Sequence, residues 1–310
     1  MGGLSLRVIP VPAYGAEDVA VGRDGPDEGA VFTGTEDGRI FRISPDGGRV
    51  EPVAHTGGRP LGIEVDPERR LVVCDAHRGL LHVDPASGAI EQGPSSVDGR
   101  PMLFCNNAAL STSGDVWFTD TSTRYRIDQW KRDLVEHTRS GRLLRLEPGG
   151  RVDVVLDGLA FANGVALPAD ESFVAVAETG ARTVVRHWLT GPAAGTRDLL
   201  VGDLPGYPDN ISRGSDGLIW VSITSPTDPL AEAVHRLPPW LRRPIAALPE
   251  RVQPKPKRTV RVQAYSADGI LVRDLDVRTD DFHMVTGVRE HDGRVWLGSL
   301  QEPAVATLEL

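Results

Sequence analysis

The chain alternates apolar and polar residues in short runs, which is the pattern of β-strands that bury one face. The clearest example lies at 204–222, where the sequence reads LPGYPDNISRGSDGLIWVS. An apolar-alternating run begins at Ile211, an Asp216-Gly217 turn follows, and a second run reads LIWVS. Strand, Asp-Gly turn and strand predict a β-hairpin.

The same hairpin unit recurs along the chain. Its copies start near residues 17, 61, 106, 163, 209 and 284, at separations of 44, 45, 57, 46 and 75 residues. A third and a fourth strand follow most copies. Four short strands per unit at this spacing are typical of a propeller blade, whereas a sandwich or a β-helix does not explain such a unit repeated six times. We therefore predict an all-β fold, a six-bladed β-propeller that occupies residues 1–310 as one domain.

The last copy contains about three strands after Met284 and ends at ATLEL. The segment LRVIPVP near the N-terminus is expected to supply the missing outer strand. Pairing between the two ends of the chain would then close the ring.

Two insertions account for the two long gaps, at about 121–141 and 226–258. The first contains Tyr125 and Trp130 and is expected to cross one face of the ring with one helical turn. The second predicts two short amphipathic helices broken by Pro238 and Pro239, then an extended Pro/Lys stretch that ends at Arg258. A lid, a partner or membrane-surface contact, and a solvated loop all remain open for it.

Composition excludes several classes of protein. A net charge of −9 and a pI near 5.4 argue against nucleic acid as the main partner. No run of 18 apolar residues predicts a membrane span, and MGGLSLRVIPVP lacks the features of a signal peptide, so we expect a cytoplasmic protein. Cys74 and Cys105 are expected to be reduced. The oligomeric state stays open.

Polar oxygen donors stand where the inner strands of the predicted blades begin. In a propeller these positions cluster around the mouth of the central channel. Carboxylates and amides without Cys or His suit Ca²⁺ far better than Zn²⁺, with Mg²⁺ and Mn²⁺ as alternatives. Four of the six copies begin in this way, with Glu17-Asp18, Asn106-Asn107, Asn163 and Asp209-Asn210.

The motifs GAEDVAV, FCNN, FANGVAL, LPGYPDNIS and REHDGRVWLGS resemble those of the strictosidine synthase-like proteins. That family belongs to a wider superfamily with the gluconolactonase/regucalcin and paraoxonase enzymes, and the resemblance covers nearly the whole chain. In the paraoxonase-like enzymes a Glu, two Asn and an Asp-Asn pair hold a calcium ion at the channel mouth. The resemblance therefore implies one Ca²⁺, held by Glu17, Asn106, Asn163, Asp209 and Asn210.

The chain departs from these families at two positions. Leu61 stands where the paraoxonase-like motif has a His before its Gly62 equivalent, so that proton-transfer residue is missing. Thr286 stands where strictosidine synthases carry a catalytic Glu, which argues against their condensation reaction. The remaining candidates for proton transfer are His283, Asp18 and His137.

The leading hypothesis is a calcium-dependent hydrolase that acts on lactones or aryl esters as small-molecule substrates. The ion would polarise the carbonyl and stabilise the oxyanion. The sequence contains no G-x-S-x-G motif and no pattern of a Cys nucleophile. One alternative is a biosynthetic enzyme that condenses, cyclises or rearranges a small metabolite. Another is a non-catalytic propeller that binds a small molecule or a partner.

Overall fold

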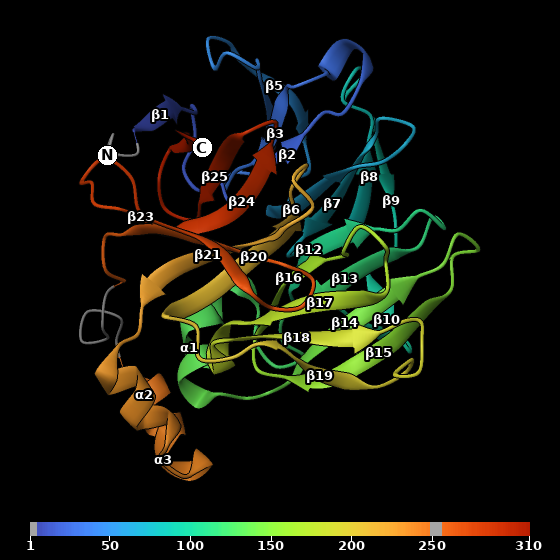
Figure 1. The fold of residues 1–310 in the computed structure, drawn as a ribbon. Helices are drawn as coiled ribbons and strands as arrows, with labels where there is room; N and C mark the ends of the chain where they lie inside the picture. The colour runs from blue at the N-terminus through green and yellow to red at the C-terminus, as the bar shows by residue number, and fades with distance from the viewer. Residues whose placement is uncertain (1–4, 249–255) are drawn as a thin grey trace.

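The structure is a computed structural model that describes residues 5–248 and 256–310. Six four-stranded antiparallel sheets form the blades of a β-propeller, which confirms the predicted fold (Figure 1). Each inner strand contacts the inner strands of neighbouring blades, from β2 through β24 and back to β2.

The blades follow the chain in order. Blade one contains β2 (Ala20–Val21), β3 (Val31–Gly34), β4 (Arg39–Ile43) and β5 (Val50–His55). Blade two contains β6 (Pro60–Val65), β7 (Leu71–Asp75), β8 (Gly79–Val83) and β9 (Ile90–Gln92). Blade three contains β12 (Cys105–Leu110), β13 (Val116–Asp120), β14 (Gly141–Leu146) and β15 (Val152–Leu159).

Blade four contains β16 (Ala162–Ala166), β17 (Phe173–Glu178), β18 (Thr183–Trp188) and β19 (Arg197–Val201). Blade five contains β20 (Gly206–Arg213), β21 (Ile219–Pro226), β22 (Val260–Tyr265) and β23 (Leu271–Val277). Blade six contains β24 (Val285–His291), β25 (Arg294–Ser299), β26 (Ala304–Glu309) and β1 (Leu6–Pro10). A small hairpin, β10 (Ser96–Val97) with β11 (Arg100–Pro101), and two 3₁₀ turns, η1 (Gly25–Asp27) and η3 (Thr179–Ala181), lie between or after blade strands.

The N-terminal strand closes the ring as predicted. β1 pairs antiparallel with β26, with Leu6 opposite Leu308 and Ile9 opposite Val305. Ile9 and Val305 are buried in one apolar cluster with Val31 and Phe41 of blade one. The first strand of the chain therefore joins the last blade to the first.

A β-bulge interrupts the inner strand of blades two to six at equivalent positions. Pairing with the second strand slips between Cys105 and Ala108 in β12, and likewise in β6, β16, β20 and β24. Each slip spans two residues, and a bulge of this kind changes the direction in which a side chain points. The bulge pairs are Leu61-Gly62, Asn106-Asn107, Asn163-Gly164, Asp209-Asn210 and Thr286-Gly287, and Glu17-Asp18 precede β2 in blade one.

Glycine and a polar residue alternate around the ring at the second of these two positions. A Cβ atom on Gly164 would lie 2.1 Å from the backbone nitrogen of Ile211, and one on Gly62 would lie 2.6 Å from the Cα of Asn107. Every second blade therefore has glycine because the backbone of the next inner strand passes directly against it. The alternating residues are Asp18, Gly62, Asn107, Gly164, Asn210 and Gly287.

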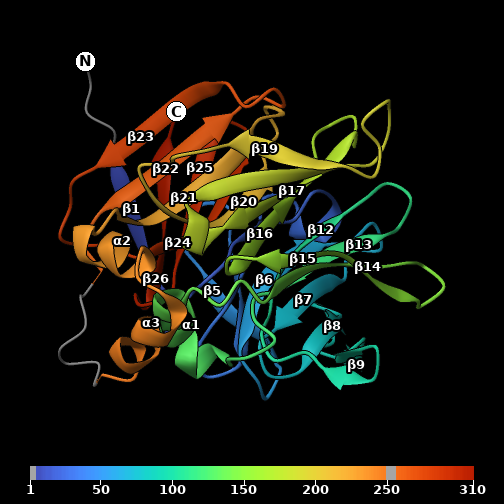
Figure 2. The ribbon, with the colours of Figure 1, turned by 90° about the horizontal axis from the view of Figure 1, so that it is seen from below.

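The two insertions form three helices that lie together on one side of the ring (Figure 2). The first insertion contains η2 (Ile127–Gln129) and α1 (Trp130–Glu136), which is longer than the single turn predicted. The second contains α2 (Pro229–His235) and α3 (Pro239–Ala246), which confirms two short helices separated at Pro238. Asp228 caps α2 by accepting from the backbone nitrogen of Leu230 at 2.8 Å. Most of the predicted Pro/Lys stretch, residues 249–255, lies outside the described residues.

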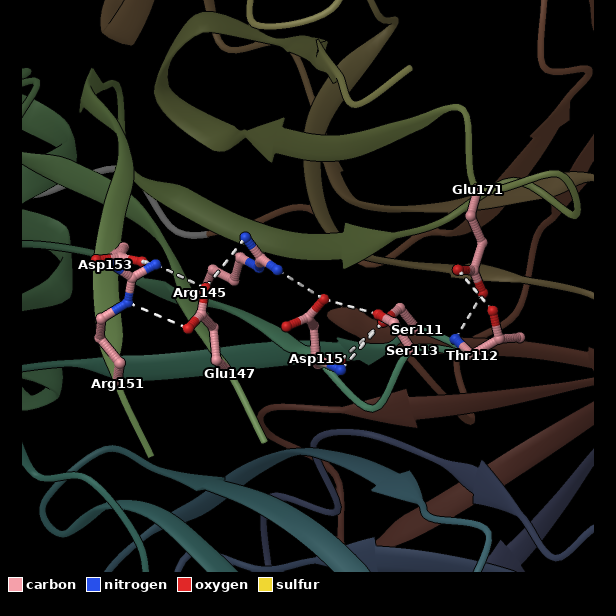
Figure 3. A network of polar contacts seen from close by, with 9 residues as sticks. All are labelled: Ser111, Thr112, Ser113, Asp115, Arg145, Glu147, Arg151, Asp153 and Glu171. Atoms are coloured by element: carbon pink, nitrogen blue, oxygen red, sulfur yellow. Dashed lines mark hydrogen bonds and ion pairs between the residues drawn. The ribbon is translucent and has the colours of Figure 1, made fainter. Parts of the chain in front are cut away.

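A polar network on the outside of the ring joins blades three and four (Figure 3). Glu171, in the turn between β16 and β17, accepts from the backbone nitrogen of Thr112 at 2.9 Å and from its hydroxyl at 3.0 Å. Nearby, Nη2 of Arg145 forms an ion pair with Oδ2 of Asp115 at 3.0 Å. The network fixes the turns at the end of the ring away from the three helices.

Cys74 and Cys105 are both buried and unbridged, as expected. No helix within the described residues is long and apolar enough to cross a membrane.

Candidate metal centre and cavity

Five polar residues predicted as metal ligands lie at the starts of the inner strands of four blades. Four of them, Glu17, Asn106, Asn163 and Asp209, line one cavity. Asn210 completes the group from the bulge of β20, where its Nδ2 donates to Oε1 of Glu17 at 3.1 Å. The strand bulges therefore bring side chains that are far apart in sequence to one end of the channel.

Two threonines fix the orientation of the asparagine amides. The hydroxyl of Thr121 donates to the carbonyl of Ala162 at 2.7 Å, so it accepts from Nδ2 of Asn106 at 2.8 Å. The hydroxyl of Thr179 donates to the carbonyl of Pro208 at 2.7 Å and accepts from Nδ2 of Asn163 at 3.2 Å. Because each hydroxyl proton is already used, each amide must present its NH₂ group to the threonine.

This orientation leaves a set of buried oxygens without partners. Each such atom costs about 1–3 kcal/mol if nothing satisfies it. Within the described part of the chain no hydrogen bond reaches Oε2 of Glu17 or Oδ1 of Asn106, Asn163 and Asn210. Together with the carboxylate of Asp209, these four oxygens are hard donors from two carboxylates and three amides, which fit the coordination that Ca²⁺ prefers.

The electrostatics of the group also favour a cation. Burial, with the nearby carboxylates of Asp18 and Asp209, raises the pKa of Glu17 well above its ordinary value. Burial raises the pKa of Asp209 to about 8, and the charge of Asp18 adds to this effect. A positive charge between these carboxylates would stabilise their charged forms. Among the described residues no three His, Cys, Asp or Glu side chains form a metal cluster, since here asparagines supply most of the donors.

Asp18 and Asn107, the second residues of their pairs, have a different role. Oδ2 of Asp18 accepts from the backbone nitrogen of Ile63 at 3.0 Å and from Nδ2 of Asn107 at 3.3 Å. Oδ1 of Asn107 accepts from the backbone nitrogen of Val165 at 2.9 Å. Each side chain thus ties its blade to the next one, while Asn210 at the equivalent position leaves its Oδ1 unpaired.

The three candidates for proton transfer, Asp18, His137 and His283, are not among the described residues that line the cavity. Burial raises the pKa of Asp18 to about 6, against the effect of Arg289. Nδ1 of His283 contacts Glu302 in a short ion pair. Their roles in proton transfer stay predictions.

His137 lies at the C-terminal end of α1, beside the second insertion. Its ring centroid is 4.7 Å from that of His235 of α2. Burial, and then the charges of His235 and Arg139, lower the pKa of His137 to about 4. His137 is therefore neutral at pH 7, and it joins the two insertions rather than the oxygen group.

The cavity above the oxygen group has a volume of about 400 Å³. Its walls come from blade loops and from all three helices and are mostly apolar. The apolar lining includes Leu61, Phe104, Trp130, Leu134, Phe161, Val234 and Ile245. Phe104 and Phe161 meet edge to face with centroids 5.8 Å apart, directly beside the bulges that carry Asn106 and Asn163. An apolar cavity with a few convergent polar groups is the usual form of a small-molecule site.

Sequence reasoning missed the two threonines. Each follows an acidic residue at the end of a second strand, as Asp120-Thr121 and Glu178-Thr179. The acid accepts from the backbone nitrogen just ahead of the inner strand, at Phe104 for Asp120 and at Ala160 for Glu178. This repeat-equivalent acid-Thr pair is the signal that could have identified them.

The chain is similar to known families over its whole length. Residues 107–192 match the family described as strictosidine synthase, and residues 4–43 match the N-terminal part of strictosidine synthase-like proteins. A strictosidine synthase-like protein 10 of Arabidopsis thaliana is 32% identical over 99% of this chain and 88% of its own length. The adipocyte plasma membrane-associated protein of Rattus norvegicus is 34% identical over 90% of this chain and 80% of its own.

Solved structures share the fold at much lower identity. A gluconolactonase from Xanthomonas campestris superposes with a TM-score of 0.71 at 18% identity, over 99% of this chain and 90% of the other. A regucalcin from Agrobacterium tumefaciens, described as a calcium-binding protein, superposes with a TM-score of 0.68 at 12% identity, over 99% and 95%.

The fold and the site define a six-bladed propeller with an apolar cavity above a group of buried oxygens. The chain belongs to the strictosidine synthase-like family.

Proposed function

We propose that the protein is a calcium-dependent hydrolase of lactones or aryl esters. The observation that carries the proposal is a set of four buried, unpartnered oxygens, three of them on residues that line an apolar cavity. The likeness to a gluconolactonase and a calcium-binding regucalcin supports the fold that such a site uses.

The ligands would be Glu17, Asn106, Asn163, Asp209 and Asn210. When bound there, Ca²⁺ supplies Lewis acidity toward a carbonyl oxygen. The protein's own residues do the rest. Thr121 and Thr179 hold the asparagine oxygens in place. The apolar wall binds the non-polar part of the substrate and excludes bulk water, which strengthens electrostatic interactions inside the cavity.

Among the described residues, the acids that line the cavity are Glu17, Asp209 and Asp228, and Oε1 of Glu17 already accepts from Nδ2 of Asn210. We assign the proton from the attacking water to Asp209, because a base must lie within reach of the water that it activates.

A condensation of the strictosidine synthase kind has less support. The residue in the position of its catalytic Glu, Thr286, lines the cavity but donates its hydroxyl proton to the carbonyl of Glu17 at 2.7 Å. A hydroxyl used in this way is not available as a general base. A protein that only binds a small molecule would show no turnover. The assay described next detects this outcome.

The test combines metal analysis with an assay of phenyl acetate and γ-lactone hydrolysis, before and after EGTA. We expect about one calcium per chain and turnover that EGTA abolishes and added Ca²⁺ restores. Asp209→Ala should lose both the metal and the turnover. Asp203→Ala removes a carboxylate whose side chain is fully exposed in the loop just before β20, and it should retain both. Calcium bound without turnover on either substrate would reject the hydrolase.

A further inference from the structure

One face of the second insertion exposes apolar side chains to solvent. Trp240 is 69% exposed, Leu230 is 59% exposed and Leu248 is 48% exposed. Arg236 and Arg243 are exposed between them. We call this surface the cap face, made of Leu230, Ala233, Arg236, Trp240, Arg243 and Leu248. Figure 1 shows α2 and α3, in orange, projecting from the ring where this face lies.

The cap face is the outer side of helices whose inner side is already used. In α3, Arg242 and Ala246 are buried and Ile245 lines the cavity, so Trp240 and Arg243 point to the opposite side. Among the described residues, packing against α1 therefore accounts for one side of α3, and Trp240 and Arg243 on the other side stay exposed. An exposed tryptophan next to arginines on a short amphipathic helix is typical of an interfacial segment.

The charge of this segment is opposite to that of the chain. Residues 226–258 carry seven Lys or Arg against three Asp or Glu, a net of +4, although the whole chain carries −9. A cationic, apolar face on an acidic protein complements an anionic lipid surface.

The cavity opens on the same face. Leu230 and Leu248 are both exposed and part of the cavity lining, and exposed Lys257 lines it as well. A lipid surface against the cap face would therefore meet the cavity mouth directly. Apolar compounds dissolved in the lipid could enter without crossing water.

We propose that the cap face docks the protein on an anionic lipid bilayer, as an interfacial contact that does not span it. This proposal is independent of the hydrolase reaction, since it concerns binding alone.

A second exposed apolar patch provides a control within the same chain. Ile270 is 64% exposed and Val272 is 53% exposed, in and next to β23. Their neighbours in sequence include Asp268, Asp274 and Asp276, so this patch lacks a cationic excess. Like the cap face it exposes apolar side chains, but it lacks the cationic charge of the cap face.

The experiment is co-sedimentation of the full chain with vesicles of phosphatidylcholine, alone or with a third of phosphatidylserine. EGTA is present throughout, so that Ca²⁺ does not bridge protein and lipid. We expect binding at least about tenfold stronger to the anionic vesicles, weakening as sodium chloride rises. The double variant W240S/R243E should bind the anionic vesicles about tenfold more weakly than the wild type. The matched variant I270S/R273E should bind them like the wild type.

Three results would overturn the proposal. They are equal binding to both vesicle types, unchanged binding of W240S/R243E, and dimerisation through the cap face in place of lipid binding. Circular dichroism and thermal unfolding check that the variants are folded. Because no substrate or calcium is needed for sedimentation, failure here is distinguishable from failure of the proposed hydrolase.

Discussion

Asn210 and Glu17 are 193 residues apart in sequence, yet Nδ2 of Asn210 donates to Oε1 of Glu17 at 3.1 Å. This contact crosses the channel mouth from blade five to the segment that enters blade one. The bond uses Oε1 of Glu17 and Nδ2 of Asn210. The other side-chain atoms, Oε2 of Glu17 and Oδ1 of Asn210, remain without a hydrogen-bond partner. One hydrogen bond therefore orients two of the proposed ligands.

Asn210→Ala should weaken calcium binding by about 10- to 100-fold, because it removes one ligand and the group that orients another. Isothermal titration with CaCl₂ measures the affinity. Asp203→Ala serves as the reference for a nearby, exposed substitution. Unchanged affinity in Asn210→Ala would remove Asn210 from the ligand set.

Thr121→Val tests the orientation of Asn106. The variant keeps the shape of the side chain but lets the amide rotate, so calcium affinity should fall by about tenfold or more. Loss of the buried hydrogen bonds should also cost about 1–3 kcal/mol in the free energy of unfolding.

Thr119→Val is the matched control for this experiment. Its hydroxyl is equally buried, donates to the backbone carbonyl of Asn163 at 2.7 Å and accepts from the backbone nitrogen of Asn107 at 3.3 Å. Unlike Thr121, it therefore contacts the asparagine backbone and does not orient a side-chain amide. It should lose similar stability in urea denaturation and keep its calcium affinity. If both variants lose affinity equally, the effect is one of stability and not of orientation.

Gly164→Ala tests the close contact between inner strands. A new Cβ atom would lie 2.1 Å from the nitrogen of Ile211, so the strands would have to separate. We expect a loss of at least about 3 kcal/mol in the free energy of unfolding, or failure to fold. Gly149→Ala, where a Cβ atom would meet nothing within 4 Å, should change stability by less than about 0.5 kcal/mol.

Acid should destabilise the contact between the insertions through His137. Its folded-state pKa of about 4 lies below its unfolded value of about 6.5, so the unfolded state binds the proton first as pH falls. Stability is therefore fully present above about pH 6.5 and is lost as pH falls toward 4, by about 1–2 kcal/mol after allowing for solvent screening.

Thermal unfolding between pH 7 and pH 4.5 measures this effect. His137→Asn should flatten the dependence, because Asn also accepts the left-handed conformation of φ 52° that His137 adopts. His55→Asn, at the exposed end of β5, should leave the pH dependence as it is in the wild type. A variant His137→Asn that responds to acid like the wild type would contradict the assignment.

The repeat in the sequence was enough to predict the blades and the polar residues at their inner starts. The chain has four asparagines in all, at 106, 107, 163 and 210, and each lies at an inner-strand bulge. These positions need a residue whose backbone fits the strand bulge and whose side chain supplies hydrogen-bonding atoms.

The sequence alone did not determine which member of each polar pair faces the cavity. Asn106 and Asn107 are adjacent and chemically identical, and the bulge in β12 directs one to the cavity and the other to the nitrogen of Val165. The surroundings of His283 likewise depend on another segment of the chain. It does precede the sixth inner strand, but Glu302 from the loop before β26 pairs with its ring. Both outcomes depend on contacts between segments that local patterns do not encode.

The pairing of β1 with β26 has a consequence for biosynthesis. During translation the first five blades leave the ribosome before the strand that completes the circle, and until then blade one has no sixth blade to hold it in place. We therefore expect Glu17 and Asn210 to approach each other stably only once Ala304–Glu309 has emerged and joined Leu6–Pro10. The oxygen group would then be assembled late, when the newly made chain closes on itself.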